Sequence, residues 1–519
     1  MNQADGTAAR MGEARETLER VWGYGDFRGR QAEAIERTLA GAGSGGGHTL
    51  VLMPTGGGKS LCYQVPALLL RGLTVVLSPL VALMKDQVDA LVARGIDAAY
   101  INAALPRSER DARYAALADG RYKLLYVTPE RFRKDEFRAA LAGRKVSLLA
   151  IDEAHCVSSW GHDFRPDYTR LAELRALMDN PTTIALTATA TPTVQQDIVN
   201  QLGLTNQMTI LSEGIDRPNL ALDIANVWGD DEKLDAITQA AAELRQPGAT
   251  SGAGIVYFAL IRTLEAFSEH LHHRGVPHLA YHGRLDRQAR RRAQDRFMGN
   301  GDPRGVGGAK AAGLDETAQK QHIVLATNAF GMGIDKADIR FVLHAEGPGS
   351  VEGYYQEIGR AGRDGQPANC TLLYDEHDLE TQMTFIRWSN PGGEYYQRVV
   401  HLLEHHAEQA HAFGIDYLRE KLHGKQRGDF RLETALNMLY RHGVIDARES
   451  NDGAKPLTIE HAITHGLIDV VGDLPDALLD EDALADKLKA DQQRLYAMVE
   501  YARCEDDRRV FLNRYFGVG

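Results

Sequence analysis

Short, continuously apolar runs recur along the first part of the chain, and stretches with helical spacing of apolar residues separate them. The runs span residues 48–52, 73–78, 123–128, 146–151 and 182–187. A strand buried on both faces is apolar throughout, whereas a half-exposed strand alternates apolar and polar residues. The pattern therefore predicts a parallel sheet covered by helices on both faces, which is a doubly wound α/β domain.

A second series of the same kind begins after residues 216–218. Its apolar runs span residues 254–258, 278–281, 322–326 and 339–343, with one helix predicted over 262–274 and an arginine-rich helix after 281. The stretch 299–321 is rich in Gly, Ala and Asp and lacks apolar periodicity, so we expect a flexible surface insertion there. The fold class that follows is α/β, with two tandem parallel-sheet lobes.

From about residue 390 the pattern becomes helical. Apolar residues share one face of each of two short predicted helices: Ile415, Leu418 and Leu422, and then Leu432, Leu436 and Leu439. Two short helices, a basic turn and the following apolar pair 444–445 indicate a helix-turn-helix or winged-helix module. Its basic residues can contact DNA phosphates, but a solvated, purely structural module fits the pattern equally well. These residues are Lys421, Lys425, Arg427, Arg431 and Arg441.

These patterns divide the chain into six segments. We predict a flexible N-terminus over residues 1–15, a first lobe over 16–216 and a second lobe over 217–385 that carries the insertion 299–321. A helical, winged-helix-like insertion over 386–465 follows. An acidic linker over 466–482 then leads to a final helical segment over 483–519.

Length and composition agree with a multidomain protein that contacts no membrane. A chain of 519 residues exceeds what one hydrophobic core usually supports. No apolar run approaches the roughly 20 residues of a membrane span, and the N-terminus lacks the apolar region of a secretion signal, so we expect a cytoplasmic protein. The net charge of −12 disfavours a polyanionic partner on average, but arginines cluster locally in residues 284–296 and 419–441.

A glycine-rich stretch, Met53-Pro54-Thr55-Gly56-Gly57-Gly58-Lys59-Ser60, lies between the first apolar run and a predicted helix. Consecutive glycines let the backbone close around an anion, so that its N–H groups and the helix N-terminus face the same phosphates. Lys59 then reaches the β- and γ-phosphates, and the Ser60 hydroxyl binds Mg²⁺. The strict pattern has glycine where this chain has Met53, and a glycine-rich hairpin with an incidental lysine is the alternative. The stretch predicts a nucleotide site.

Two carboxylates, Asp152 and Glu153, come directly after the apolar run 146–151. Ligands of open α/β sheets bind at the carboxyl ends of the strands, so we expect both carboxylates to face the phosphate loop. Asp152 can hold the Mg²⁺ that Ser60 also touches, and Glu153 can orient or deprotonate the attacking water. A solvated acidic turn is the alternative interpretation.

Gln356, Arg360 and Arg363 lie at helical or near-helical spacing in the second series. Planar guanidinium groups match phosphate oxygens, and an arginine from a separate domain stabilises transition-state charge only when that domain closes. Gly359 and Gly362 interrupt the helix and permit close backbone approach, which argues against a simple exposed basic helix end. We therefore predict that these three residues complete the catalytic site from the second lobe.

Together these stretches resemble a superfamily-two helicase, and more narrowly the RecQ family of DNA helicases. The further matching pieces are residues 78–88, 128–130, 186–190 and 326–336, and the resemblance covers approximately residues 16–378. Methionine at position 53 is normal for that superfamily. The resemblance implies two RecA-like lobes, ATP and Mg²⁺ as cofactors, and 3′→5′ unwinding of DNA in repair and recombination.

The resemblance also implies roles for residues that pattern alone leaves as ordinary packing. Residues 23–31 resemble the family's adenine-recognition motif, in which Tyr24 and Arg28 sandwich the base and Gln31 hydrogen-bonds its edge. Residues 158–168 resemble its aromatic-rich loop, and aromatic faces stack on bases at roughly 1–3 kcal/mol each. The DNA-binding residues implied there are Trp160, Phe164, Arg165 and Tyr168. The residues implied to couple the lobes are His155, Thr187 and Thr189.

The C-terminal part of the chain resembles the family less. Residues 501–517 are similar to the start of its zinc-binding segment, with Cys504 at or near the first ligand position. One cysteine cannot make a structural zinc site, so we expect zinc only if the chain continues beyond Gly519. The other three cysteines are far apart and form no C-x-x-C pair, so no disulfide framework is expected.

The expected partners are single-stranded DNA, tailed duplex DNA and a single-strand-binding protein, and we expect a monomer associated with the nucleoid. Two other functions stay open: an ATP-driven translocase that remodels duplex DNA without separating strands, and an RNA helicase. A DNA-binding protein with a decayed motor is disfavoured because Lys59, Asp152, Glu153 and Arg363 are all present.

Overall fold

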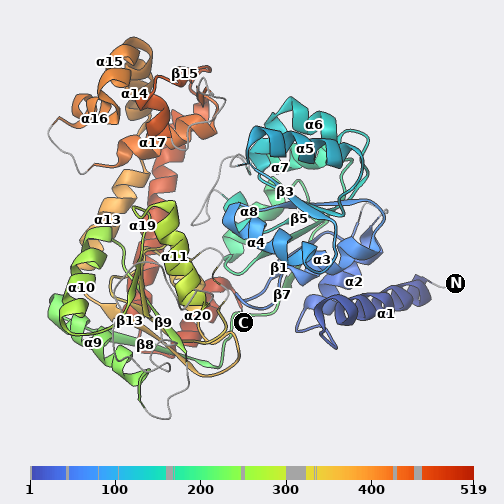
Figure 1. Cartoon of the computed structure of the whole chain (residues 1–519), viewed down its shortest axis with the longest axis horizontal. Coiled ribbons are helices and arrows are strands. Elements are labelled where there is room, and N and C mark those ends of the chain that lie inside the picture. Colours follow the sequence, from blue (N-terminus) through green and yellow to red (C-terminus); the bar gives the residue numbers. More distant parts are fainter. Residues whose placement is uncertain are drawn as a thin grey trace.

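The computed structural model describes residues 3–42, 46–79, 81–102, 105–158, 168, 170–246, 252–299, 323–331, 334, 336–424, 429–448 and 459–518. They form two lobes, each a parallel sheet flanked by helices, and a mainly helical module that is joined to the second lobe by two helices (Figure 1). This confirms the predicted fold class. No helix among the described residues is both long and apolar enough to cross a membrane.

The first lobe contains a seven-stranded sheet of order β3-β4-β2-β5-β6-β1-β7, in which every pair is parallel. Its strands are β1 (Thr49–Leu52), β2 (Leu73–Leu77), β3 (Ala98–Ile101), β4 (Leu124–Val127), β5 (Val146–Ile151), β6 (Thr182–Thr187) and β7 (Thr209–Ser212). β1, β2, β4, β5 and β6 are buried along almost their whole length, as their continuous apolar runs predict. The sequence patterns did not indicate β3 and β7, which are four-residue strands at the two edges of the sheet.

Helices cover both faces of this sheet. They are α1 (Gln3–Trp22), α2 (Gln31–Gly41), α3 (Leu61–Leu69), α4 (Val81–Val92), α5 (Arg107–Ala118), α6 (Asp135–Leu141), α7 (Leu171–Leu177) and α8 (Pro192–Gln201), with short 3₁₀ turns η1 (Pro129–Arg133) and η2 (Ala154–Val157). Residues 3–15, for which the sequence predicted a flexible N-terminus, belong to α1. Met11, Ala14 and Leu18 share one helix face and are buried in a cluster with α2 and α3.

The second lobe contains a six-stranded parallel sheet of order β10-β11-β9-β12-β13-β8. Its strands are β8 (Leu220–Asn226), β9 (Ala253–Tyr257), β10 (Leu279–Tyr281), β11 (Ile323–Ala326), β12 (Ile339–His344) and β13 (Ala368–Tyr374). Its helices are α9 (Gly229–Glu243), α10 (Ile261–His273), α11 (Arg287–Met298), α12 (Val351–Ile358) and α13 (Asp378–Ser389). The predicted insertion 299–321, apart from Gly299, lies outside the described residues.

We refer to residues 393–478 as the accessory module. Its elements are α14 (Gly393–His405), α15 (Ala407–Phe413), α16 (Ile415–His423), α17 (Arg431–Arg441), β14 (Ile445–Ala447), α18 (Ile459–Thr464), β15 (Ile468–Val470) and η5 (Asp476–Leu478). The helices enclose a hydrophobic core of their own. β14 pairs antiparallel with β15, and α18 lies between these two strands in sequence. Part of the predicted acidic linker 466–482 is thus strand β15. Its residues Ile468 and Val470 pack against the core of the module.

Two C-terminal helices return the chain to the second lobe. They are α19 (Glu481–Arg503) and α20 (Arg508–Phe516), and Met498, Tyr501, Leu512 and Phe516 enter the core of that lobe. The Tyr515 hydroxyl donates to Glu352 Oε1 on α12 at 2.9 Å. α12 leads directly into the predicted catalytic arginines, so the C-terminal helices support the element that carries them.

Candidate active site

The phosphate loop, residues 53–60, connects β1 to α3. Gly56 (φ +83°) and Gly58 (φ +74°) adopt left-handed conformations that favour glycine. The Lys59 ammonium turns back over the loop and donates to Met53 O at 3.2 Å and to Pro54 O at 3.4 Å. The loop thus has the closed shape expected of an anion cradle, with a cation held across it by weak carbonyl contacts.

The charged groups of both lobes meet at Lys59. Burial lowers the pKa of Lys59, and the negative charges of Glu153 and Asp152 oppose that effect. The guanidinium of Arg363, which belongs to the second lobe, lowers the same pKa further. The lysine therefore lies within the electrostatic range of two carboxylates from its own lobe and of a cation from the other.

Asp152 follows β5 and is buried. Burial, and then repulsion by Glu153, raise the pKa of the Asp152 carboxyl to about 7, although the charge of Lys59 and a hydrogen bond from Gln87 oppose the rise. Gln87 lies on α4 and also accepts a hydrogen bond from the Tyr63 hydroxyl at 2.8 Å. Sequence reasoning assigned Gln87 no role, although it falls in the matching stretch 78–88.

Glu153 has an unusual backbone conformation. Its φ and ψ are both +50°, in the left-handed region that non-glycine residues rarely adopt and that costs of order 1–3 kcal/mol. Its Oε2 atom is buried without a hydrogen-bond partner, and so is Thr55 Oγ1 in the phosphate loop. Buried oxygens that lack partners fit a site completed by a polar ligand. Oxygen atoms of Asp152 and Ser60 are also the ligand type that Mg²⁺ prefers.

The three residues implied to couple the lobes form one network in the first lobe. His155 Nδ1 lies 3.0 Å from Thr187 Oγ1 and 3.4 Å from Glu153 Oε2. The Thr187 hydroxyl donates to Thr189 O at 3.3 Å, and Thr189 N–H donates to Thr187 Oγ1 at 3.2 Å. A hydroxyl has one proton, so when the Thr187 hydroxyl donates to Thr189 O it accepts from a protonated His155 Nδ1. The network connects β6 with the Glu153 carboxylate.

Arg363 reaches the phosphate loop from the second lobe. A β-carbon placed on Gly56 would lie 3.3 Å from Arg363 Cγ, and one placed on Gly359 would lie 3.0 Å from Thr55 Oγ1. Glycine at both positions therefore permits the close approach of the two lobes. The structure brings Arg363 to the position that the sequence predicts for it.

The other two residues predicted from the second lobe lie differently. Arg360 is only 7% exposed, and its Nη1 donates to Gly331 O inside the second lobe. Gln356 is half-buried on α12. In this conformation the Arg360 guanidinium is hydrogen-bonded within the second lobe. Of the two arginines, therefore, only Arg363 reaches the phosphate loop.

Arg217 joins the two sides of the site, and sequence reasoning missed it. Its Nη2 donates to Ala361 O at 2.8 Å and to Gly362 O at 2.9 Å, while Nη1 donates to Thr55 O at 3.2 Å. It thus connects the phosphate loop with the backbone that precedes Arg363. The only sequence signal was its position between Asp216 and Pro218, at the boundary of the two series.

The residues implied to bind adenine lie beside the phosphate loop. Arg28 Cζ lies 5.8 Å from the centre of the exposed Tyr24 ring, so these two side chains face each other. Gln31 is buried, and its Nε2 donates to Gly57 O at 2.9 Å while its Oε1 accepts from Arg28 N–H. The Gln31 amide therefore ties the motif to the phosphate loop in this structure.

Three of the four residues implied to bind DNA, Trp160, Phe164 and Arg165, lie outside the described residues. Tyr168 is 1% exposed and packs in the core of the first lobe with Leu171. The prediction that Tyr168 contacts DNA does not fit this burial, because a ring enclosed by core residues offers no face to a base.

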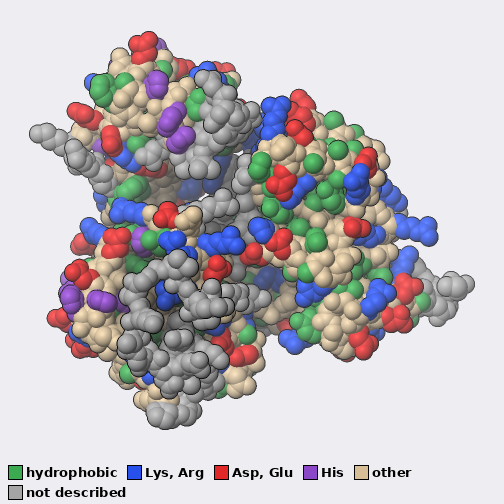
Figure 2. All heavy atoms as spheres, in the orientation of Figure 1, with side chains coloured by type: hydrophobic (Ala, Val, Ile, Leu, Met, Phe, Trp, Pro, Cys, Tyr) green, Lys and Arg blue, Asp and Glu red, His purple; other side chains and the backbone are tan. Residues whose placement is uncertain are grey.

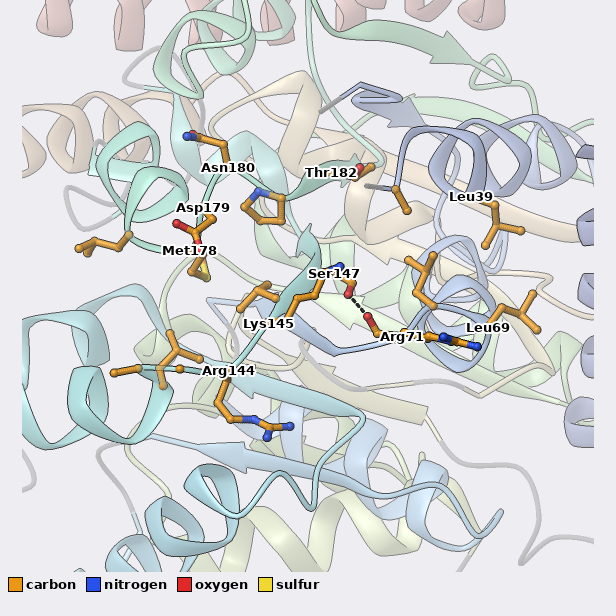
Figure 3. Close-up of a pocket in the computed structure, with 18 of the residues that line it drawn as sticks. Leu39, Leu69, Arg71, Arg144, Lys145, Ser147, Met178, Asp179, Asn180 and Thr182 are labelled. Carbon is orange, nitrogen blue, oxygen red and sulfur yellow. Dashed lines mark hydrogen bonds between the residues drawn. The ribbon is translucent and has the colours of Figure 1, made fainter. Parts of the chain in front are cut away.

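A pocket of about 1060 Å³ lies at the N-terminal ends of β5 and β6, on the side of the first sheet opposite the phosphate loop (Figure 3). Its basic residues include Arg71, Arg144 and Lys145, and its wall includes Asp179. The C-terminal ends of α2, α3, α6 and α7 meet there, so helix carbonyls surround it and disfavour a phosphate. Arg10, for example, donates to Leu39 O at 2.7 Å. We assign the nucleotide to the phosphate loop.

Comparisons with known proteins show which proteins this chain resembles. Residues 28–198 match the family model described as a DEAD/DEAH box helicase, and residues 232–365 match the helicase conserved C-terminal domain. Over 377 residues the chain is 43% identical to the ATP-dependent DNA helicase RecQ of Bacillus subtilis, covering 72% of this chain and 58% of that protein. Over 396 residues it is 37% identical to the probable ATP-dependent DNA helicase RecS of the same species, covering 76% and 73%.

The chain therefore spans little more than half the length of the RecQ protein, at 58%. Among solved structures, the fold is similar to that of the Mycobacterium smegmatis helicase Lhr bound to single-stranded DNA and AMP-PNP, with a TM-score of 0.51. That match has 19% identity and covers 89% of this chain and 62% of Lhr. It supports the fold alone.

Proposed function

Because this chain belongs to the RecQ family of superfamily-two helicases, we propose that it is an ATP-dependent DNA helicase that moves 3′→5′ along single-stranded DNA and unwinds duplexes during repair and recombination. The proposed ATPase activity rests on one observation. Lys59 interacts electrostatically with Asp152 and Glu153 of its own lobe and with Arg363 of the other lobe. DNA as the substrate, the polarity and the role in repair rest on the family.

The residues of the site support the following cycle of ATP hydrolysis. Mg²⁺, held by Asp152 and the Ser60 hydroxyl, would neutralise charge on the ATP phosphates. The Lys59 ammonium exchanges its carbonyl contacts for phosphate oxygens, and Glu153 Oε2 accepts the proton of the attacking water. Arg363 stabilises the transition state only while the lobes are closed, so hydrolysis and lobe opening are coupled.

Strand displacement on tailed duplexes tests the proposal. With ATP and Mg²⁺, the protein should displace the strand of a 3′-tailed duplex and leave a 5′-tailed duplex intact, and Lys59→Ala should displace neither. ATP hydrolysis stimulated by single-stranded DNA without displacement of either duplex would favour a duplex translocase instead. Stimulation by RNA but not by DNA would favour an RNA helicase.

Arg217→Ala should lower the turnover number for ATP hydrolysis about tenfold with little change in the apparent affinity for ATP. The variant loses the hydrogen bonds that hold the backbone before Arg363 against Thr55 O, and each such bond to a charged group contributes about 1.5–3 kcal/mol. Steady-state kinetics with saturating single-stranded DNA measures both constants.

Arg509→Ala is a matched control for this prediction. Arg509 Nη2 donates to Leu220 O at 2.7 Å, so it binds the start of the same lobe without contacting the phosphate loop. An equal loss of turnover in both variants would mean that Arg217 only stabilises the fold of the second lobe.

A further inference from the structure

Arg363 lies on the loop of residues 359–367, which connects α12 to β13 and which we call the arginine loop. The backbone of this loop bonds to the chain that leads into β12. The N–H groups of the residues before and after Arg363 donate to the carbonyl oxygens of Ile339 and Ala337, at 2.9 Å and 3.3 Å. Backbone bonds therefore hold both neighbours of Arg363 within the second lobe.

An ion pair holds the same loop through a side chain. Arg340 on β12 is 7% exposed, and its Nη2 donates to Asp364 Oδ2 at 2.5 Å while its Nη1 donates to Pro367 O at 3.2 Å. The other carboxylate oxygen of Asp364 accepts from Gln366 N–H at 3.1 Å. One guanidinium thus fixes two points of the arginine loop, and one of them is the residue next to Arg363.

The surroundings of Arg340 give its guanidinium a defined position. A β-carbon placed on Gly252 would lie 2.4 Å from Arg340 Cγ, so glycine is needed beside the stem of this side chain. Figure 2 shows Lys and Arg side chains interspersed with Asp and Glu over the visible face of the molecule, and exposed pairs of that kind contribute little. The pair with Asp364 differs because its cation is buried and also bonds to a backbone carbonyl.

The opposite side of the arginine loop is bound by residues that precede β8. Asn219 Nδ2 donates to Gly362 O at 2.8 Å and to Gln366 O at 2.9 Å. Arg217 donates to the two carbonyl groups that immediately precede Arg363. The loop is therefore held on two sides, and the Arg363 side chain extends from it to the phosphate loop of the first lobe.

The charge of Asp364 gives the ion pair a second effect. Burial raises the pKa of the Asp364 carboxyl, but the hydrogen bonds from Arg340 and from Gln366 N–H outweigh it and bring the pKa below its ordinary value. The side chain is thus a carboxylate at neutral pH, directly next to Arg363 in the chain. Without Arg340 this negative charge would attract the neighbouring guanidinium away from a phosphate.

We propose that Arg340 and Asp364 are positioning residues for Arg363: their ion pair fixes the arginine loop so that the Arg363 guanidinium meets the transferred phosphate when the lobes are closed. A misplacement of about 1 Å in a catalytic group can cost 10²-fold in rate, so the loop must be held accurately. The role assigned to the pair rests on the proposed ATPase function.

A double-mutant cycle tests whether the pair acts through Arg363. Asp364→Ala should lower the turnover number for ATP hydrolysis about 10- to 100-fold with little change in KM for ATP. In the Arg363→Ala background the same substitution should change the turnover number less than about twofold, because the residue through which it acts is absent. Equal fold-losses in both backgrounds would overturn the proposal.

Binding of fluorescent ADP with Mg²⁺, with and without aluminium fluoride, provides a second measurement. The wild-type protein should bind ADP more tightly with aluminium fluoride, because the complex mimics the transferred phosphate in the transition state. Asp364→Ala should lose most of this gain and bind ADP alone as the wild type does. A full gain in Asp364→Ala would overturn the proposal, whereas a wild-type protein without any gain and without ATP hydrolysis would contradict the proposed function itself.

Two further variants separate positioning from stability. Asp364→Asn keeps an oxygen that accepts from Arg340, so it should retain the turnover number within about threefold. Asp378→Ala is the matched control, because Asp378 accepts from the buried Lys233 Nζ at 2.8 Å and 3.0 Å, beyond the opposite end of β13. It should lower the unfolding temperature and keep the gain from aluminium fluoride. Loss of the gain in Asp378→Ala as well would mean that any weakened ion pair of the second lobe disturbs the site, which overturns a specific role for Asp364.

Discussion

Glu153→Gln should reduce ATP hydrolysis about a thousandfold while ATP binding changes little, because general-base catalysis contributes typically 10²–10⁴-fold. Glutamine has nearly the same shape as glutamate, so the left-handed backbone at position 153 and the neighbouring Asp152 should stay in place. The side chain keeps an oxygen near His155 but no longer accepts a proton from water. Single-turnover hydrolysis and equilibrium binding of a fluorescent ATP analogue separate the two effects.

The thermal unfolding of this variant provides the control. Removing the charge of Glu153 removes its repulsion of Asp152 and also its attraction to Lys59, so we expect the two effects to offset each other in the stability of the first lobe. An unchanged or higher unfolding temperature with lost hydrolysis supports a catalytic role. If hydrolysis survives at more than about a tenth of the wild-type rate, another group must activate the water.

Arg363→Ala should lower the turnover number by about a thousandfold or more, since an arginine supplied from a second domain contributes 10³–10⁵ to phosphoryl transfer. The side chain packs on Gly56 in the phosphate loop and is the cation of the second lobe that Lys59 senses. Arg363→Lys should restore little activity, because lysine lacks the planar fork that matches phosphate oxygens. The loss should appear in the turnover number rather than in ATP affinity.

Arg360→Ala is the informative comparison for this prediction. Arg360 is buried and donates to Gly331 O within the second lobe, so its loss should lower the unfolding temperature as well as the activity. Arg363→Ala should leave the unfolding temperature unchanged. If both variants lose hydrolysis with equal and unchanged stability, Arg360 also acts on the nucleotide, and the lobes must close further than in this structure.

Contacts from Arg217 and from the C-terminal helices hold the segment of the second lobe that carries Arg363. Arg217 holds the backbone that precedes Arg363, and α19 and α20 pack on α12 through Tyr501 and Phe516. The accessory module lies between α13 and α19 in sequence, and α19 also packs against α12 of the second lobe.

The sequence by itself determined the features that lie within short, contiguous segments of the chain. Unbroken apolar runs predicted five strands of the first sheet, since a strand buried on both faces has no other pattern. The glycines at 56 and 58, the lysine that follows and the carboxylates after β5 indicated the nucleotide site, because a phosphate cradle and the carboxyl end of a strand are both short segments.

Only the tertiary structure decided which side chains from distant segments meet. Arg360 and Arg363 have the same side chain and lie three residues apart, and only the tertiary structure shows that Arg360 bonds to Gly331 within the second lobe whereas Arg363 packs beside Gly56 of the phosphate loop. The sequence pattern does not distinguish Tyr168 from an exposed aromatic residue. Only the structure shows that core residues enclose its ring. Arg217 bonds to carbonyls of both lobes, and no sequence pattern marks backbone acceptors. Contacts of this kind depend on how the lobes pack, which local periodicity does not encode.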